Sequence, residues 1–171
     1  MHSHTNDLRS IDVVSLAEAQ SSHQQHDAVI TIEDPDCGFG LRVKNGMPQL
    51  VLAFNDIDRL DRHWVAPSVE HVTQAIDFAR QHKDGKLLIH CAAGVSRSPA
   101  IALAILADRI GAGRETDAVE YLFSKYAGIE PNERVVACAD RVLQRDRSLL
   151  GAFRRKAAEV AKSKNKEKFS W

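Results

Sequence analysis

The stretch KLLIHCAAGVSRSPAIALAILA, residues 86–107, decides the fold of this chain. It opens with KLLIH, a strand pattern without polar alternation, as in a parallel strand covered on both faces. Small residues follow as far as Arg97, and a second apolar run then begins at once. Ser98 and Pro99 suit the N-cap and the first turn of a helix. We expect that helix to be central and buried because it is apolar nearly all round.

The segments around this stretch predict an α/β fold with a central, mostly parallel sheet flanked by helices. Short β-branched or apolar runs alternate with helical patterns in the first half of the chain, and helical patterns alone follow residue 98. We expect strands at 11–16, 28–32, 49–54 and 86–90, and helices at 16–26, from 68, from 98, at 116–126, from 131 and from 148.

The length of 171 residues is enough for one domain with a substantial core. We expect a flexible N-terminus at 1–9, a single domain at 10–153 and a basic C-terminal tail at 154–171. The tail is rich in lysine and arginine and has few acids. We interpret it as the solvated end of the last helix rather than as a patch for nucleic acid or lipid.

The composition excludes several classes of protein. Lysine and arginine total 23, and aspartate and glutamate also total 23, so no overall field attracts nucleic acid or an acidic membrane. Residues 1–25 lack the apolar segment of a secretory signal, and no apolar run is long enough to span a bilayer. Cys37, Cys91 and Cys138 are an odd, widely spaced set, which argues against a disulfide framework. We therefore expect a soluble, cytoplasmic protein.

The loop between the strand and the helix at 86–107 can form an anion site. Its residues are mostly too small to cover their own backbone: Ala92, Ala93, Gly94, Val95 and Ser96. Curled into a ring, the loop would direct several N–H groups inward, beside the positive end of the helix. Arg97 adds a planar fork that can hold two phosphate oxygens. The same field would stabilise a thiolate at Cys91, so the segment predicts attack of sulfur on a bound phosphoryl group.

The run from His90 to Ser98, HCAAGVSRS, resembles the HCxxGxxR[ST] signature of cysteine-dependent protein tyrosine phosphatases. The longer form HCAAGVSRSPA is most similar to the dual-specificity branch. The order of strands and helices is similar over about residues 10–147. Scattered positions in LAFNDI, VAP, EHV and FAR resemble small bacterial-type members. The resemblance implies the dual-specificity-like phosphatase fold, a catalytic domain at 10–153, and neither a metal nor a cofactor.

The resemblance also implies a role for each residue of the signature. Cys91 would be the nucleophile and would form a phosphocysteine. Arg97 would bind the phosphate oxygens, together with the backbone N–H groups of 92–97. Ser98 would hydrogen-bond the sulfur and ease its departure, and His90 would brace the loop from behind. We therefore expect a phosphoprotein phosphatase acting on phosphotyrosine, with phosphoserine and phosphothreonine left open.

A general acid must protonate the leaving group. The resemblance places it at an aspartate in a loop ahead of the cysteine, where Asp56, Asp58 and Asp61 lie. We favour Asp56 because it follows the strand pattern QLVLAF almost directly, and Asp58 is the alternative. The chain lacks the Trp-Pro-Asp form of the tyrosine-specific enzymes, and Trp64 lies too far downstream to replace it. Tyrosine specificity is therefore less well supported than the chemistry.

Two other interpretations of the anion loop stay open. Rhodanese-like and arsenate-reductase-like thiol enzymes also pair a cysteine with such a loop, although His90 and the Arg97-Ser98 ending speak against them. A non-catalytic module could use the loop to bind phosphopeptides, although such modules usually lose the cysteine, the arginine or the acid. The expected partner is a phosphorylated protein. The uncharged loop disfavours a phosphoinositide, and we expect a monomer.

The remaining cysteines and histidines suggest no second site. Cys37 and Cys138 are expected to be structural, and a protective disulfide of either with an oxidised Cys91 is the minor alternative. Four histidines lie in a polar stretch without cysteine or acidic partners: His2, His4, His23 and His26. We therefore predict no metal site there.

Overall fold

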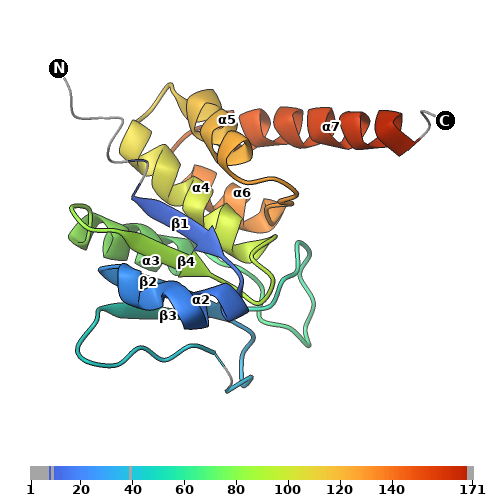
Figure 1. Cartoon of the computed structure of the whole chain (residues 1–171). Helices are drawn as coiled ribbons and strands as arrows, with labels where there is room; N and C mark the ends of the chain where they lie inside the picture. Colours follow the sequence, from blue (N-terminus) through green and yellow to red (C-terminus); the bar gives the residue numbers. More distant parts are fainter. Residues whose placement is uncertain (1–7, 9, 39, 169–171) are drawn as a thin grey trace.

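The computed structural model describes residues 8, 10–38 and 40–168 (Figure 1). Within these ranges, four strands form one sheet in the order β1-β4-β2-β3. β4 (Leu87–His90) pairs with β1 (Ile11–Val14) and with β2 (Ala28–Glu33), and β2 also pairs with β3 (Gln49–Ala53). Every pairing is parallel. The predicted α/β class with a mostly parallel sheet is confirmed.

Helices cover the two faces of the sheet unequally (Figure 1). On one face, α2 (Leu16–Ser22) packs with the segment 41–47 over Val29 and Leu88, and the short 3₁₀ helix η1 (His23–Gln25) follows α2. On the other face, α3 (Val69–Gln81) and α4 (Arg97–Ile110) pack against the strands. Three more helices pack outside them: α5 (Glu115–Lys125), α6 (Glu133–Val142) and α7 (Ser148–Lys168).

The helix α4 lies at the centre of the core, as its apolar sequence predicts. Residues 97–107 are all buried, and the helix contacts β1, β4, α3, α5 and α6. Each buried aliphatic side chain, such as Ile101 or Leu103, contributes about 1.5–3 kcal/mol to folding. Since β4 is also buried throughout, the loop between β4 and α4 has firm support at both ends.

The prediction that Ser98 caps α4 is wrong. The helix begins at Arg97 with Ser96 in the N-cap position, so Ser98 and Pro99 are its second and third residues. Pro99 still lies in the first turn, where a missing N–H removes no intrahelical bond. The Ser98 hydroxyl is used elsewhere, because its Oγ lies 3.2 Å from the Sγ of Cys91. The side chain that propensity assigns to capping thus contacts the sulfur.

The C-terminal helix α7 runs without a break across residue 153, the expected end of the domain. Asp140 anchors its start by accepting hydrogen bonds from the N–H groups of Arg147 (2.7 Å) and Leu150 (3.0 Å). Farther along, Arg154 pairs with Glu133. Of the predicted flexible N-terminus at 1–9, all but Leu8 lies outside the described residues, as do 169–171. In the part of the chain that the structure describes, no helix combines the length and apolarity needed to cross a bilayer.

Candidate active site

The carboxyl ends of the parallel strands bring the candidate site together at one edge of the sheet. Cys91 directly follows β4, and Asp34 directly follows β2. Asp56 lies three residues beyond the end of β3, and Ser15 follows β1. Residues that are far apart in the sequence therefore meet around the loop 91–96.

Cys91 lies at the base of this loop, with only 3% of its surface exposed. The backbone N–H of Gly94 donates a hydrogen bond to its Sγ over 3.3 Å, and the Oγ of Ser98 lies 3.2 Å from the same sulfur. The Gly94 amide donates to this sulfur, and the Ser98 hydroxyl can donate to it when the sulfur is a thiolate. The predicted inward direction of loop amides is therefore seen at Gly94.

Three carbonyl groups of the loop accept hydrogen bonds from two neighbouring segments. Ala92 O accepts from the N–H of Leu16 (3.0 Å) at the start of α2. Between α5 and α6, the N–H groups of Glu130 and Asn132 donate to Val95 O (2.9 Å) and Ser96 O (3.1 Å). A carbonyl oxygen repels an anion. Because these three oxygens are hydrogen-bonded to neighbouring segments, the loop is better suited to bind a phosphate.

Gly94 has a conformation that only glycine adopts without strain. Its φ is +72°, and a Cβ built there would lie 2.8 Å from backbone atoms of Val14 and Ser15. We expect Gly94→Ala to destabilise the protein by about 3 kcal/mol, because left-handed strain and a backbone clash add. Gly113→Ala is the matched control, since its φ is +83° but open space surrounds it, and should cost about 1 kcal/mol. Urea unfolding measures both, and equal losses would contradict the close approach.

Arg97 is anchored by a carboxylate that the sequence analysis did not single out. Its Nη1 donates to Asp34 Oδ1 and to Phe54 O, both over 2.8 Å, and the side chain is buried. Its Nε is also buried and has no hydrogen-bond partner among the described residues. The anchored end thus fixes the guanidinium, and the unpaired Nε is available to a phosphate oxygen. Asp34 could have been found in the sequence as the first residue after a buried parallel strand.

We expect Asp34→Asn to lower kcat/KM for a phosphomonoester about tenfold, because the ion pair with Arg97 is lost and the guanidinium then donates only to an uncharged amide oxygen. The loss should appear mainly in KM and in the inhibition constant of free phosphate. Asp36→Asn is the matched control on the same loop. Steady-state kinetics measure kcat and KM of both variants. An equal loss of kcat/KM in the two would rule out a specific role of the Asp34 carboxylate.

Asp56 lies beside the loop and holds two hydrogen bonds on one carboxylate oxygen. Its Oδ1 accepts from Ser96 Oγ (2.7 Å) and from Asn132 Nδ2 (2.9 Å). The same Nδ2 also donates to Ile57 O over 3.2 Å. Asp58 lies beyond this contact and lines the groove that adjoins the loop. Of the two candidate acids, Asp56 is therefore the one that hydrogen-bonds to the loop residue Ser96.

Asn132 is a second residue that the sequence analysis did not single out. Its Oδ1 caps α6 by accepting from the N–H of Val135 (3.0 Å), while its Nδ2 holds Asp56. The sequence signal was available, since Pro131 and Asn132 open a helical pattern. A helix start by itself gives no indication of the contact with Asp56.

His90 braces the loop through a chain of hydrogen bonds across the sheet. Gln49 Nε2 donates to Thr31 Oγ1 (2.8 Å), which lies 2.9 Å from His90 Nε2. His90 Nδ1 lies 3.2 Å from Cys91 O. A carbonyl only accepts, so Nδ1 carries the proton and Nε2 accepts from Thr31. Burial lowers the pKa of His90, which agrees with this neutral form.

His71 is also held neutral. Its Nδ1 accepts from the N–H of Ser68 over 3.2 Å in a capping box at the start of α3. Its ring packs on Phe54 with centroids 4.9 Å apart, and burial lowers its pKa.

Both lowered histidine pKa values make the protein less stable in mild acid. The unfolded chain takes up these protons near pH 6.5, whereas the folded chain resists them. Stability is therefore fully present above pH 6.5 and falls as the pH drops. We expect the Tm to decrease by about 2–4 °C between pH 7.5 and 5.5, and His71→Gln to reduce that decrease. A Tm that is constant or rises on acidification would contradict both neutral assignments.

The other cysteines and the described N-terminal histidines take no part in the contacts described above. Cys37, Cys91 and Cys138 are all free thiols, and burial raises the pKa of Cys138. His2 and His4 lie outside the described residues. His26 lies 3.1 Å from Asp12. No group of three or more candidate metal ligands occurs within residues 8, 10–38 and 40–168.

The family of the chain follows from a comparison with family models. The model of the dual specificity phosphatase catalytic domain matches residues 15–137, which include every residue of the site described above. The chain belongs to this family. The resemblance inferred from HCAAGVSRS is thereby confirmed, and the dual-specificity-like fold with it.

Individual proteins match the chain either over a short segment or at low sequence identity. Dual specificity protein phosphatase 5 of Rattus norvegicus is 41% identical over 64 residues, which are 36% of this chain and 16% of that protein. Among solved structures, the human tyrosine phosphatase-like serine/threonine/tyrosine-interacting protein has a TM-score of 0.61 at 21% identity, over 79% of this chain and 91% of that one. DUSP15 has a TM-score of 0.60 at 18% identity, over 88% and 91%. These structures share the fold.

Proposed function

We propose that this chain is a protein phosphatase that hydrolyses phosphomonoesters through a phosphocysteine at Cys91. One observation carries the proposal. The Sγ of Cys91 lies within hydrogen-bond distance of a loop amide and of the Ser98 hydroxyl. Three carbonyls of the same loop accept hydrogen bonds from neighbouring segments, and Arg97 begins the helix that follows.

In the first step, Cys91 Sγ attacks phosphorus while the bond to the leaving oxygen breaks. Arg97 and the amides of 92–97 bind the phosphoryl oxygens and stabilise their charge in the transition state. Asp56 donates its proton to the leaving oxygen. Among the described residues both of its hydrogen bonds go to Oδ1, which leaves Oδ2 to carry that proton.

In the second step, Asp56, now ionised, removes a proton from water, and the water oxygen attacks phosphorus. The bond between sulfur and phosphorus breaks, and phosphate leaves. The Ser98 hydroxyl donates a hydrogen bond to the departing thiolate, which lowers the barrier to its departure. His90 holds the carbonyl of Cys91 and so keeps the sulfur in place.

The proposal also covers the substrate, the domain bounds, the compartment and the oligomeric state. The substrate is a phosphorylated protein carrying phosphotyrosine, with phosphoserine and phosphothreonine as further substrates. Residues 10–153 form the catalytic domain and 154–171 the basic tail, of which 154–168 belong to α7. The chain acts in the cytoplasm as a monomer, and three free thiols agree with a reducing compartment.

Turnover of three substrates separates this proposal from its alternatives. An aryl phosphate should be hydrolysed in a vanadate-sensitive reaction, while thiosulfate and arsenate should not turn over. Preferred turnover of thiosulfate or arsenate would indicate a sulfur-transfer or reductase enzyme. Tight binding of a phosphopeptide by the wild type without hydrolysis would indicate a binding module. Phosphotyrosine and phosphothreonine peptides of one sequence then rank the substrates.

A further inference from the structure

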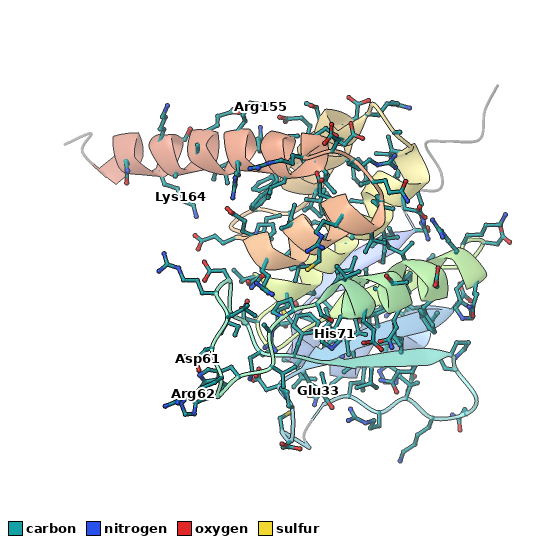
Figure 2. All side chains as sticks on the ribbon, turned by 180° about the vertical axis from the view of Figure 1, so that it is seen from behind. Glu33, Asp61, Arg62, His71, Arg155 and Lys164 are labelled. Atoms are coloured by element: carbon teal, nitrogen blue, oxygen red, sulfur yellow. The ribbon has the colours of Figure 1, made fainter. Side chains whose placement is uncertain are left out.

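A groove of about 1,090 Å³ lies beside the catalytic loop. One wall is the loop that follows Asp56, including Leu60 and Trp64, and the opposite wall is α7, including Phe153 and Val160. Val95 and Ser96 of the catalytic loop also line the groove. We name it the α7 groove. In Figure 2, Lys164 extends from α7 on the side of the loop that carries Asp61, and Arg155 extends on the other side.

The α7 groove is continuous with the catalytic centre. Asp56 and Ser96, which hydrogen-bond each other over 2.7 Å, both line it. A polypeptide whose phosphoryl group lies in the cradle must pass over this end of the groove. The residues beside the phosphorylated one are therefore the natural occupants.

Exposed apolar side chains give the groove its first chemical preference. Leu60 is 77% exposed and Trp64 is 56% exposed, although both are large and apolar. Ala157 and Val160 of α7 lie across from them. Such a cluster beside a catalytic loop is typical of a surface that covers a ligand. A large apolar residue of the substrate fits between the two walls.

The charges of the groove give a second preference. Five acidic and two basic side chains line it: Asp56, Asp58, Asp61, Glu130, Glu133, Arg59 and Lys164. Lys164 pairs with Glu130 over 3.0 Å, Arg154 pairs with Glu133, and Asp56 carries the proton for the leaving group. Among the described lining residues, Asp58 and Asp61 then stand against Arg59 alone. Because the chain as a whole is neutral, this local excess of acid favours a basic residue in the groove and disfavours an acidic one.

We propose that the α7 groove binds the segment of a phosphorylated polypeptide that flanks the phosphorylated residue, and that it selects a large apolar residue together with a lysine or arginine. The inference rests on the proposed function for the position of the phosphoryl group. It adds the sequence that the substrate carries and gives α7 a role in recognition.

Binding to the Cys91→Ser variant tests the groove independently of turnover. Phosphotyrosine peptides of equal length would carry Leu-Arg, Leu-Glu or Gly-Ser beside the phosphotyrosine, on either side of it. Fluorescence anisotropy should show tightest binding for Leu-Arg on one side, by about tenfold over Gly-Ser. Equal affinities for all peptides would overturn the inference. Absent turnover by the wild type would instead overturn the proposed function and leave this binding result standing.

Substitutions in the α7 groove test whether this groove is the source of the peptide preference. In the Cys91→Ser background, Val160→Trp fills the groove and should weaken binding of the Leu-Arg peptide about tenfold, while affinity for inorganic phosphate stays unchanged. Arg155→Trp is the matched control on the opposite side of α7 and should change neither affinity.

Asp61→Asn keeps an acceptor for the N–H of His63 but removes the charge. It should reduce the preference for Leu-Arg over Leu-Glu about threefold. Unchanged peptide affinities in both Val160→Trp and Asp61→Asn would exclude the groove as the binding surface.

Discussion

Cys91→Ser is expected to lower kcat for an aryl phosphate by about 10⁴-fold or more, to the limit of detection. The loop amide and the Ser98 hydroxyl that stabilise a thiolate cannot produce an alkoxide from serine at neutral pH. The fold should be retained, because serine is nearly the same size. Stopped assays at high enzyme concentration measure the residual rate.

Cys138→Ser is the matched control for this loss. Cys138 is also buried, but among the described residues its Sγ has one hydrogen bond, a long one to Pro67 O at 3.9 Å. This variant should keep kcat within about threefold of the wild type, as expected of a thiol outside the chemistry. The Cys91→Ser variant should still bind inorganic phosphate, since Arg97 and the loop amides remain. Residual activity within tenfold of the wild type would exclude Cys91 as the nucleophile.

Asp56→Asn is expected to lower kcat by about 10²–10³-fold for a substrate with a poor leaving group, such as a phenyl phosphate. An amide cannot donate the proton that the leaving oxygen needs. The loss should shrink greatly for a substrate whose leaving group departs as a stable anion. The slope of log kcat against leaving-group basicity therefore measures the role of Asp56 directly.

Asp58→Asn is the control that decides between the two carboxylates. Asp58 shares the loop with Asp56, so the two variants make the same chemical substitution in the same loop. If only Asp58→Asn steepens the slope of log kcat against leaving-group basicity, the general acid is Asp58 and not Asp56. Asn132→Ala should reproduce part of the Asp56→Asn effect, because it frees the carboxylate that Asn132 Nδ2 holds.

The sequence predicted those features that depend on neighbouring residues. KLLIH and the apolar run after Ser98 gave a buried strand and a buried helix, and both lie where we expected. The loop between them gave the family through HCAAGVSRS. The prediction of a cap at Ser98 failed because propensity treats a serine before proline as an N-cap, whereas a nearby sulfur occupies its hydroxyl.

The features that escaped prediction depend on contacts across the fold. Asp34 reaches Arg97 across 63 positions of the sequence, and Asn132 reaches Asp56 across 76. Each looked like an ordinary loop or capping residue by itself. The α7 groove likewise forms only where the loop after β3 faces a helix from the other end of the chain. Such pairs follow from the sheet order and the helix packing, which no local pattern encodes.

The central claim is that Cys91 accepts the phosphoryl group during turnover. Mixing the wild type with an aryl phosphate, quenching in acid within the first turnover, and sequencing the proteolytic fragments by mass spectrometry test it. The account predicts one phosphoryl group on the fragment that contains Cys91, at the sulfur, and none on the Cys91→Ser protein. Steady turnover with no phosphoryl group on that fragment at any quench time would contradict the account.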